Sequence, residues 1–264
     1  MAFALPYFEE LIFILGLISI GSICGLIGGV FLLWKEAFVQ KYIHFLISFA
    51  AGVLLAAAFL DLLPHAIEET PYAWLACLAG LVIFTISERS LVWHLHHKNH
   101  IRAHLSEVKI LGRKATGLLL MLGDTIHNFI DGMMIAAATL TFIPLGILTA
   151  IATFFHEIPQ EIGDFSVLIY AKYPKKKVFS YNFLSALAAF GGGLLVFFGI
   201  SLHEFNLSPL IAFGAGGFIY IAATDLLPEL KHEAQSIAVV AKHTTFLLLG
   251  MALIYALTHL LHVH

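Results

Sequence analysis

The sequence predicts an all-α membrane protein with eight transmembrane helices, and three observations point to this fold class. Hydrophobic residues make up 60% of the chain and charged residues only 12%, and the mean hydropathy is +0.92. Soluble domains are about 45–50% apolar and about 25% charged, so one compact core cannot bury this much apolar surface. The apolar runs reach the roughly 20 residues that a helix needs to cross a bilayer, and they lack the alternating pattern of membrane strands.

Breaks between the apolar runs define the individual helices. Prolines or lysines interrupt the runs, as at Pro71, Pro144 and Pro174. The expected spans lie near residues 8–34, 43–63, 72–94, 115–140, 144–170, 178–201, 208–229 and 243–262, with a His-rich loop at 95–114. The lipid bilayer is therefore the main partner that we expect, and no basic face indicates nucleic acid.

The 14 Lys and Arg residues predict the orientation. In the eight-span arrangement they all fall on one side, which the positive-inside rule makes cytoplasmic. Both termini then lie outside, and we expect the protein in the plasma or inner membrane of its cell. The cytoplasmic loop at 95–114 and the end of the preceding span contain five histidines, for which metal collection and a plain solvated loop are equally open: His94, His96, His97, His100 and His104.

Two segments of the chain resemble each other. Phe49–Pro64 reads FAAGVLLAAAFLDLLP and Phe213–Pro228 reads FGAGGFIYIAATDLLP, with eight of sixteen positions identical. They form spans two and seven, which run in opposite directions, so the pattern predicts a 3+2+3 inverted repeat. Such repeats are typical of secondary transporters, whose substrate sites lie near the midplane. Chance similarity between two apolar helices is the alternative.

Spans four and five, between the two repeats, contain an unusual number of polar residues. Ionisable groups are costly in hydrocarbon and need a partner or a function. Residues three, four or seven apart share a helix face, which gives three stripes: Asp124, His127, Asn128 and Asp131; His156 with Gln160; and Glu157 with Glu161 and Asp164. Imidazole, carboxylate and amide oxygen suit Zn²⁺, and also Fe²⁺ or Mn²⁺. A buried hydrogen-bonded network that only fixes helix packing is the alternative.

These residues resemble the signature of the ZIP family of metal transporters. HNFIDG at 127–132 and HEIPQEIGD at 156–164 are similar to the branch whose fifth span reads HExPHExGD, and the similarity extends to DLLPH, NFLSA and ATDLLPE. The resemblance implies a binuclear metal centre between spans four and five and metal movement into the cytoplasm. The implied ligands are His127, Asn128, Asp131, His156, Glu157 and Gln160. Gln160 departs from this branch, which usually has a second histidine there, and this puts metal preference and affinity in question.

Further residues are expected along the metal path. Asp61 and His65 would guard the outer entrance and Asp225 the inner exit, while Asp124, Glu161 and Asp164 extend the polar stripes. Asn182 and Ser185 either face this path or hydrogen-bond between helices, and the second interpretation is favoured. No catalytic cofactor is expected, because Zn²⁺, Fe²⁺, Mn²⁺ or Cd²⁺ would be the transported substrate. A homodimer is compatible with the sequence.

Two other classes of function compete with transport. HEIPQ at 156–160 nearly matches the HExxH motif of zinc metalloproteases, so an intramembrane metalloprotease is the main alternative. The second histidine of that motif is missing, however, and a proline interrupts the helix. A scaffold or receptor without transport is disfavoured by the repeat and by the carboxylates expected at the midplane.

Overall fold

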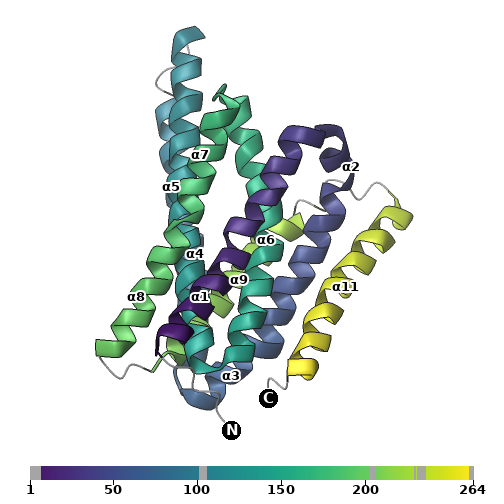
Figure 1. Cartoon of the computed structure of the whole chain (residues 1–264). Coiled ribbons are helices and arrows are strands. Elements are labelled where there is room, and N and C mark those ends of the chain that lie inside the picture. The colour runs from purple at the N-terminus through teal and green to yellow at the C-terminus, as the bar shows by residue number, and fades with distance from the viewer. Residues whose placement is uncertain (1–6, 101–105, 203–205, 229, 231–235, 262–264) are drawn as a thin grey trace.

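The structure is a bundle of helices (Figure 1). The computed structural model describes residues 7–100, 106–202, 206–228, 230 and 236–261. Within these ranges every regular element is helical, which confirms the predicted all-α class. The elements are α1 (Tyr7–Gly21), η1 (Ile23–Leu26), α2 (Ile27–Ala56), η2 (Ala57–Leu62), α3 (Leu63–Glu69), α4 (Ala73–His100), α5 (Ser106–Thr141), α6 (Ile143–Tyr170), α7 (Lys175–Ala186), α8 (Ala188–Leu202), α9 (Ser208–Ile221), η3 (Ala222–Leu226) and α11 (Ile237–Leu261).

Four helical stretches in the described part of the chain are long and apolar enough to cross a membrane. They are Phe8–Val39, Lys41–Glu69, Lys175–Gly199 and Ile237–Leu261, and Ala73–Ile86 and Ser208–Thr224 form shorter apolar helices. Helices α5 and α6 are not among them, although both are long. Their ionisable residues lower their mean hydropathy, as is expected for helices that face the inside of a bundle rather than lipid. The eight-span count stays a prediction.

The segment 95–114 differs from the predicted loop. Helix α4 continues to His100 and α5 already begins at Ser106, so most of this backbone is helical. Hydropathy shows where an apolar run ends in the sequence. A helix can continue beyond that point with polar residues that face water. The side chains of the five histidines of this segment, for which metal collection was one interpretation, lie outside the described residues. Helix α6 also runs through Pro159 as one element.

Three helix pairs make the most extensive contacts, namely α2 with α11, α4 with α9 and α5 with α8. In the first two pairs, a glycine lies directly against a backbone carbonyl of the neighbouring helix, where a side chain would not fit. The contacts are Gly52 with Leu247, Gly250 with Phe49, Gly216 with Cys77, and Gly80 with Phe213. Gly52 and Gly216 occupy the same position in the two similar segments, as do Phe49 and Phe213. The two helix pairs therefore use matching contacts.

The two similar segments also share an irregularity. A π-helical turn forms at Ala57–Leu62 in one segment and at Ala222–Leu226 in the other. Each wide turn contains the aspartate of the shared DLLP sequence, Asp61 or Asp225. π-Helical turns are rare and occur often at functional sites, because they change the direction of side chains along a helix.

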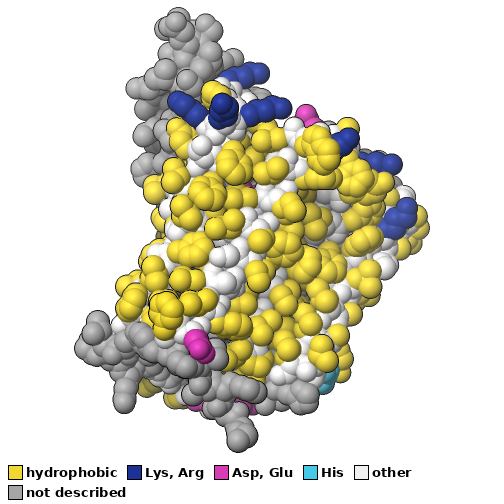
Figure 2. All heavy atoms as spheres, viewed as in Figure 1, with side chains coloured by type: hydrophobic (Ala, Val, Ile, Leu, Met, Phe, Trp, Pro, Cys, Tyr) yellow, Lys and Arg dark blue, Asp and Glu magenta, His cyan; other side chains and the backbone are white. Residues whose placement is uncertain are grey.

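The surface separates into an apolar belt and a cationic end. Figure 2 shows hydrophobic side chains over the middle of the molecule and Lys and Arg side chains gathered at the upper end. Large exposed side chains include Trp34 (74%), Leu195 (57%) and Leu249 (52%). The start of α1 and the end of α11 lie at the opposite, lower end (Figure 1). A continuous apolar surface of this kind suits contact with lipid rather than water.

Candidate metal centre

Two helices supply the polar residues that the sequence singled out. Helix α5 carries Asp124, His127, Asn128 and Asp131, and α6 carries the group from His156 to Asp164. Only Phe142 separates the two helices, so they pack side by side along much of their length. Helical periodicity gathers these residues on one face of each helix, and the packing of α5 against α6 brings the two faces together. The resulting site is buried, with exposed fractions of 2% for Asp131, 1% for His156 and 0% for Glu157.

Four side chains converge at one point between α5 and α6. The ligand atoms of His127, Asp131, His156 and Glu157 all lie within 4.8 Å of one another, and we refer to these four residues as the metal centre. The Nε2 atom of His156 lies 3.2 Å from Nε2 of His127 and 3.1 Å from Oδ2 of Asp131. Oε1 of Glu157 lies 3.6 Å from each histidine Nε2, and His127 Nε2 lies 3.5 Å from Asp131 Oδ2. Among the described residues, no other His, Cys, Asp and Glu side chains converge in this way.

The backbone orients His156. Its Nδ1 lies 3.1 Å from the carbonyl oxygen of Ala152, one turn earlier on α6. A carbonyl can only accept, so Nδ1 carries the hydrogen and, in the neutral ring, Nε2 keeps its lone pair. Nε2 then faces the carboxylate of Asp131 and the second imidazole. This orientation leaves the Nε2 lone pair of His156 directed at the point where a cation could bind, and histidine ligands are typically oriented in this way.

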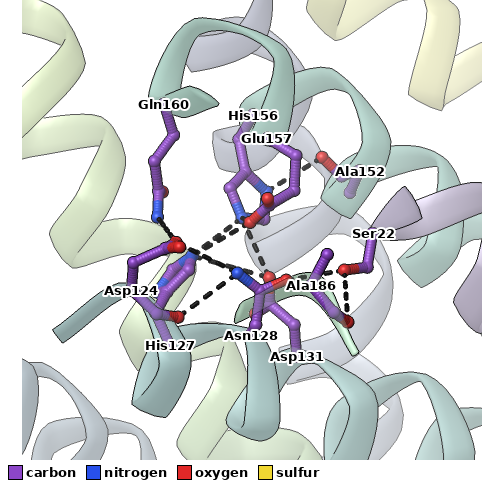
Figure 3. A network of polar contacts seen from close by, with 10 residues as sticks. All are labelled: Ser22, Asp124, His127, Asn128, Asp131, Ala152, His156, Glu157, Gln160 and Ala186. Atoms are coloured by element: carbon purple, nitrogen blue, oxygen red, sulfur yellow. Dashed lines mark hydrogen bonds and ion pairs between the residues drawn. The ribbon is translucent and has the colours of Figure 1, made fainter. Parts of the chain in front are cut away.

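Asn128 connects the metal centre to two other helical elements. Its Nδ2 donates to the side chain of Asp124 at 3.0 Å. Its Oδ1 accepts a hydrogen bond of 2.6 Å from Ser22, at the end of α1, and Ser22 lies 3.0 Å from the carbonyl oxygen of Ala186 on α7. This network fixes the polar face of α5 between α1 and α7 (Figure 3). Because Ser22 occupies Oδ1 of Asn128, the amide serves in this arrangement as a positioning group beside the metal centre.

Gln160 hydrogen-bonds within the same site. Its Nε2 donates to Oδ1 of Asp124 at 3.2 Å, which joins α6 to α5 one turn beyond His156. Figure 3 shows the Gln160 side chain directed toward the Asp124 carboxylate. Gln160 and Asn128 therefore both donate to Asp124, and this carboxylate lies beside the metal centre rather than within it.

Close helix contacts hold Glu157 in place. A Cβ atom added to Gly25 of η1 would lie 2.6 Å from the Cβ of Glu157, and one added to Gly28 would lie 2.6 Å from the carbonyl oxygen of Ile158. Glycine at these positions allows the N-terminal helices to approach the backbone of α6. Aromatic rings of α4 and α9 pack on the histidines, with centroid distances of 6.1 Å for Phe84 with His127 and 5.5 Å for Phe218 with His156.

The predicted path residues lie in different surroundings. Asp61 is buried and accepts a 2.6 Å hydrogen bond from Thr258 of α11. His65 follows one turn later and is partly buried. The side chain of Asp225 lies outside the described residues. Glu161 and Asp164 are buried on α6 and do not join the metal centre.

The sequence analysis missed Ser22 and Thr258. Both are single hydroxyl residues in apolar runs, where hydrogen bonding to the preceding turn of the same helix is the ordinary expectation. Thr258 makes that bond to Ile254 in addition to its bond to Asp61. Ser22 lies within a glycine-rich stretch from Gly21 to Gly29, and this stretch in a long apolar run was the signal that could have identified it.

Comparisons with known proteins agree on one family. A family model described as ZIP zinc transporter matches residues 9–109 and 90–258. Human zinc transporter ZIP10 is 39% identical over 143 residues, which are 52% of this chain and 17% of that protein. Human ZIP6 is 38% identical over 144 residues (54% and 18%), and rat ZIP4 is 38% identical over 114 residues (43% and 17%). The chain thus spans less than a fifth of the length of these relatives.

Proposed function

We propose that this chain, which belongs to the ZIP zinc transporter family, moves zinc or a related divalent metal ion across a membrane through the metal centre between α5 and α6. The chain is an integral membrane protein, in keeping with its family and its apolar helices. The metal ion is the transported substrate in this proposal.

The spacing of the ligand atoms is the observation that carries the proposal. Four atoms bound at about 2.1 Å to one tetrahedral ion lie about 3.4 Å from each other. The five measured separations between the ligand atoms run from 3.1 to 3.6 Å. Two imidazoles and two carboxylates form a ligand set that suits Zn²⁺ and also accepts Fe²⁺, Mn²⁺ or Cd²⁺. Two negative charges balance the charge of a divalent ion in this buried site.

The metalloprotease alternative has lost its support. The matched relatives are named as transporters, not as enzymes. In addition, Glu157, which would act as the general base in an HExxH motif, lies among the metal ligands. A general base must instead reach a water molecule on the metal.

Eight spans in a 3+2+3 inverted repeat, with inward transport, complete the proposal. The matching glycine contacts and the paired π-helical turns support the repeat. The cationic end of the molecule would face the cytoplasm, and both termini would lie outside, most simply in the plasma or inner membrane. Asp61 with His65 would then lie near the entrance and Asp225 near the exit.

A second ion beside the first is part of the proposed arrangement. Asn128 and Gln160 lie beside the metal centre, and both donate to Asp124. To become ligands, these amides would turn their oxygens toward the ion. Filling and emptying of the site would therefore be coupled to rearrangement of this hydrogen-bond network.

Uptake into proteoliposomes tests the function directly. Vesicles that contain the purified protein should accumulate radioactive zinc faster than empty vesicles, and unlabelled Fe²⁺, Mn²⁺ or Cd²⁺ should compete with it. Uptake no faster than in empty vesicles, for all four metals, would contradict the proposal.

A further inference from the structure

A narrow groove lies between α2 and α6, with a volume of about 280 Å³. Helix α2 bends at Lys35, whose φ of −135° and ψ of 52° are not helical, so residues before and after the bend line the same groove. Phe31 and Phe38 come from the two sides of the bend, with ring centroids 5.7 Å apart. Ile158 and Ile162, one turn apart on α6, form the opposite wall.

The groove suits an apolar occupant. Of the ten described residues that line it, only Tyr42 carries a polar side-chain atom. A water molecule in a cavity needs about two to four polar partners, which these walls scarcely offer. Two lining residues, Phe38 and Tyr42, are 54% and 41% exposed, so the groove opens at the apolar surface that suits contact with lipid. An acyl chain of a membrane lipid fits this requirement, because it has no polar atoms along its length.

Two lysines lie at the edge of the groove. The Nζ atom of Lys41 lies 5.2 Å from the ring centroid of Tyr42, and Nζ of Lys35 lies 5.1 Å from that of Trp34. The Trp34 ring in turn contacts Phe31 in the groove wall, with centroids 6.0 Å apart. Exposed Trp and Tyr side chains are typical of the membrane–water interface, where lipid head groups lie. The lysines are therefore at the level of the head groups.

The charge of this bend favours a negatively charged head group. Residues 35–41 contain two lysines and one acidic residue, Glu36, so the segment carries a net positive charge. Basic pockets between membrane helices typically bind anionic phosphate head groups. A second copy of the chain fits less well, because a stable protein interface buries on the order of 1,200 Å² or more and needs a wider surface than a narrow groove.

We propose that the groove between α2 and α6 binds one anionic phospholipid, with an acyl chain between the apolar walls and the phosphate against Lys35 and Lys41. Lysine ammonium groups bind phosphate oxygens through charge-assisted hydrogen bonds. None of the described residues that line this lipid groove belongs to the metal centre. The lipid site is therefore separate from the site proposed for the transported ion.

The lipid groove also touches the helix that carries Glu157. Ile158 follows it directly, and a Cβ atom on Gly28, in the facing wall, would lie 2.6 Å from the carbonyl oxygen of Ile158. Pro159 has no N–H group, so α6 lacks one backbone hydrogen bond here and depends more on its neighbours for its position. A bound acyl chain therefore stabilises α6 beside the metal centre. Faster zinc uptake in anionic membranes follows; this consequence rests on the proposed function, whereas lipid binding does not.

Native mass spectrometry of the purified full chain tests lipid binding. Phosphatidylglycerol and phosphatidylcholine with the same acyl chains are added in turn, and the wild type should bind one phosphatidylglycerol about tenfold more tightly than phosphatidylcholine. Lys35→Gln/Lys41→Gln should lose this preference. Lys176→Gln/Lys242→Gln, which removes two exposed lysines near the starts of α7 and α11, is the matched control and should keep it. Equal affinity for both lipids in the wild type, or an unchanged preference in the first variant, would overturn the inference.

Filling the lipid groove tests its walls separately from its charge. Ile43→Trp places a large side chain in the groove and should weaken lipid binding about tenfold, because part of the acyl chain is displaced. Leu249→Trp, at an exposed position on α11, should bind like the wild type. Unchanged binding by Ile43→Trp would contradict the proposed site. If this variant does not fold, the exposed lysine pair decides. A lipid-free dimer that only Ile43→Trp disrupts would assign the groove to a second copy and overturn the inference.

Zinc uptake tests the link between the lipid groove and the metal centre. The wild type should take up zinc about fivefold faster in vesicles of equal parts phosphatidylglycerol and phosphatidylcholine than in phosphatidylcholine alone. Lys35→Gln/Lys41→Gln should lose this stimulation, whereas Lys176→Gln/Lys242→Gln should keep it in the same membranes. Equal stimulation of the two variants would overturn the link. Uptake at the rate of empty vesicles in both membranes would contradict the proposed function, and the mass spectra would still decide the lipid site.

Discussion

At the scale of the residue, the two ring nitrogens of His156 have different roles: one contacts the backbone, and the other is available to an ion. Nδ1 faces the carbonyl oxygen of Ala152, and Nε2 faces Asp131 and His127. The helix thus fixes the ring before any ion binds. Because the ring does not have to be ordered on binding, the entropic cost of capturing an ion is lower.

Replacing His156 tests its role as a ligand. His156→Ala should lower the affinity for zinc by about 100-fold, on the order of 3 kcal/mol, because one of four ligands is lost. Competition with a zinc-sensitive dye measures this affinity in detergent. His259→Ala, at an exposed position on α11, is the matched control. Equal zinc affinities in the two variants would exclude His156 from the centre.

Gln160 should tune the preference among metals. Gln160→His replaces an amide that donates to Asp124 with an imidazole one turn beyond His156. Imidazole suits zinc better than harder ions, so the half-saturating zinc concentration should fall and competition by Mn²⁺ should weaken, each on the order of fivefold. Turnover should fall as well, because a tightly bound ion leaves slowly.

Zinc uptake measured against increasing Mn²⁺ in both proteins checks this prediction. An unchanged half-saturation together with an unchanged competition profile would place residue 160 outside the coordination shell.

At the scale of the element, η1 approaches α6 closely enough to position Glu157. Gly25→Ala would bring a methyl group within 2.6 Å of the Cβ of Glu157, whereas Gly16→Ala on α1 meets nothing within 4 Å. We expect Gly25→Ala to reduce zinc uptake by about tenfold, because a small displacement of one ligand strongly affects a metal site. Gly16→Ala should retain wild-type uptake. Equal uptake by the two variants would show that η1 does not position Glu157.

The matching helix pairs should respond alike to substitution. Gly52→Ala and Gly216→Ala both place a methyl group against a backbone carbonyl, of Leu247 or Cys77. Each should destabilise the fold by about 1–3 kcal/mol, as other overpacked sites do. Gly199→Ala meets nothing within 4 Å and serves as the control. Thermal unfolding in detergent measures the effect, and a loss confined to one of the two variants would weaken the case for a repeat.

The sequence predicted these elements to different extents. The helical class followed from long apolar runs, and helical periodicity placed His127 and Asp131 on one face and His156 and Glu157 on α6. The approach of η1 to Glu157 could not be predicted, because it depends on contacts between residues far apart in the chain. The helical backbone of 95–100 and 106–114 was also missed, since hydropathy indicates where the apolar residues end and not where a helix ends.

At the scale of the whole molecule, charge and apolar surface are arranged along one axis. Lys and Arg side chains gather at one end, and the start of α1 and the end of α11 lie at the other. The sequence had predicted this separation from the eight-span arrangement alone. The metal centre lies on α5 and α6, the two helices that the repeat would enclose.

Zinc uptake by Asp131→Asn tests the central claim most directly. Asp131 approaches both histidines, at 3.1 and 3.5 Å, and the substitution removes its charge with almost no change in volume. The variant and the control Glu68→Gln should be reconstituted in equal, folded amounts, and the initial rate of radioactive zinc uptake should be measured for each. We predict that Asp131→Asn falls to the rate of empty vesicles while Glu68→Gln matches the wild type. Uptake by Asp131→Asn at the wild-type rate would contradict transport through this centre.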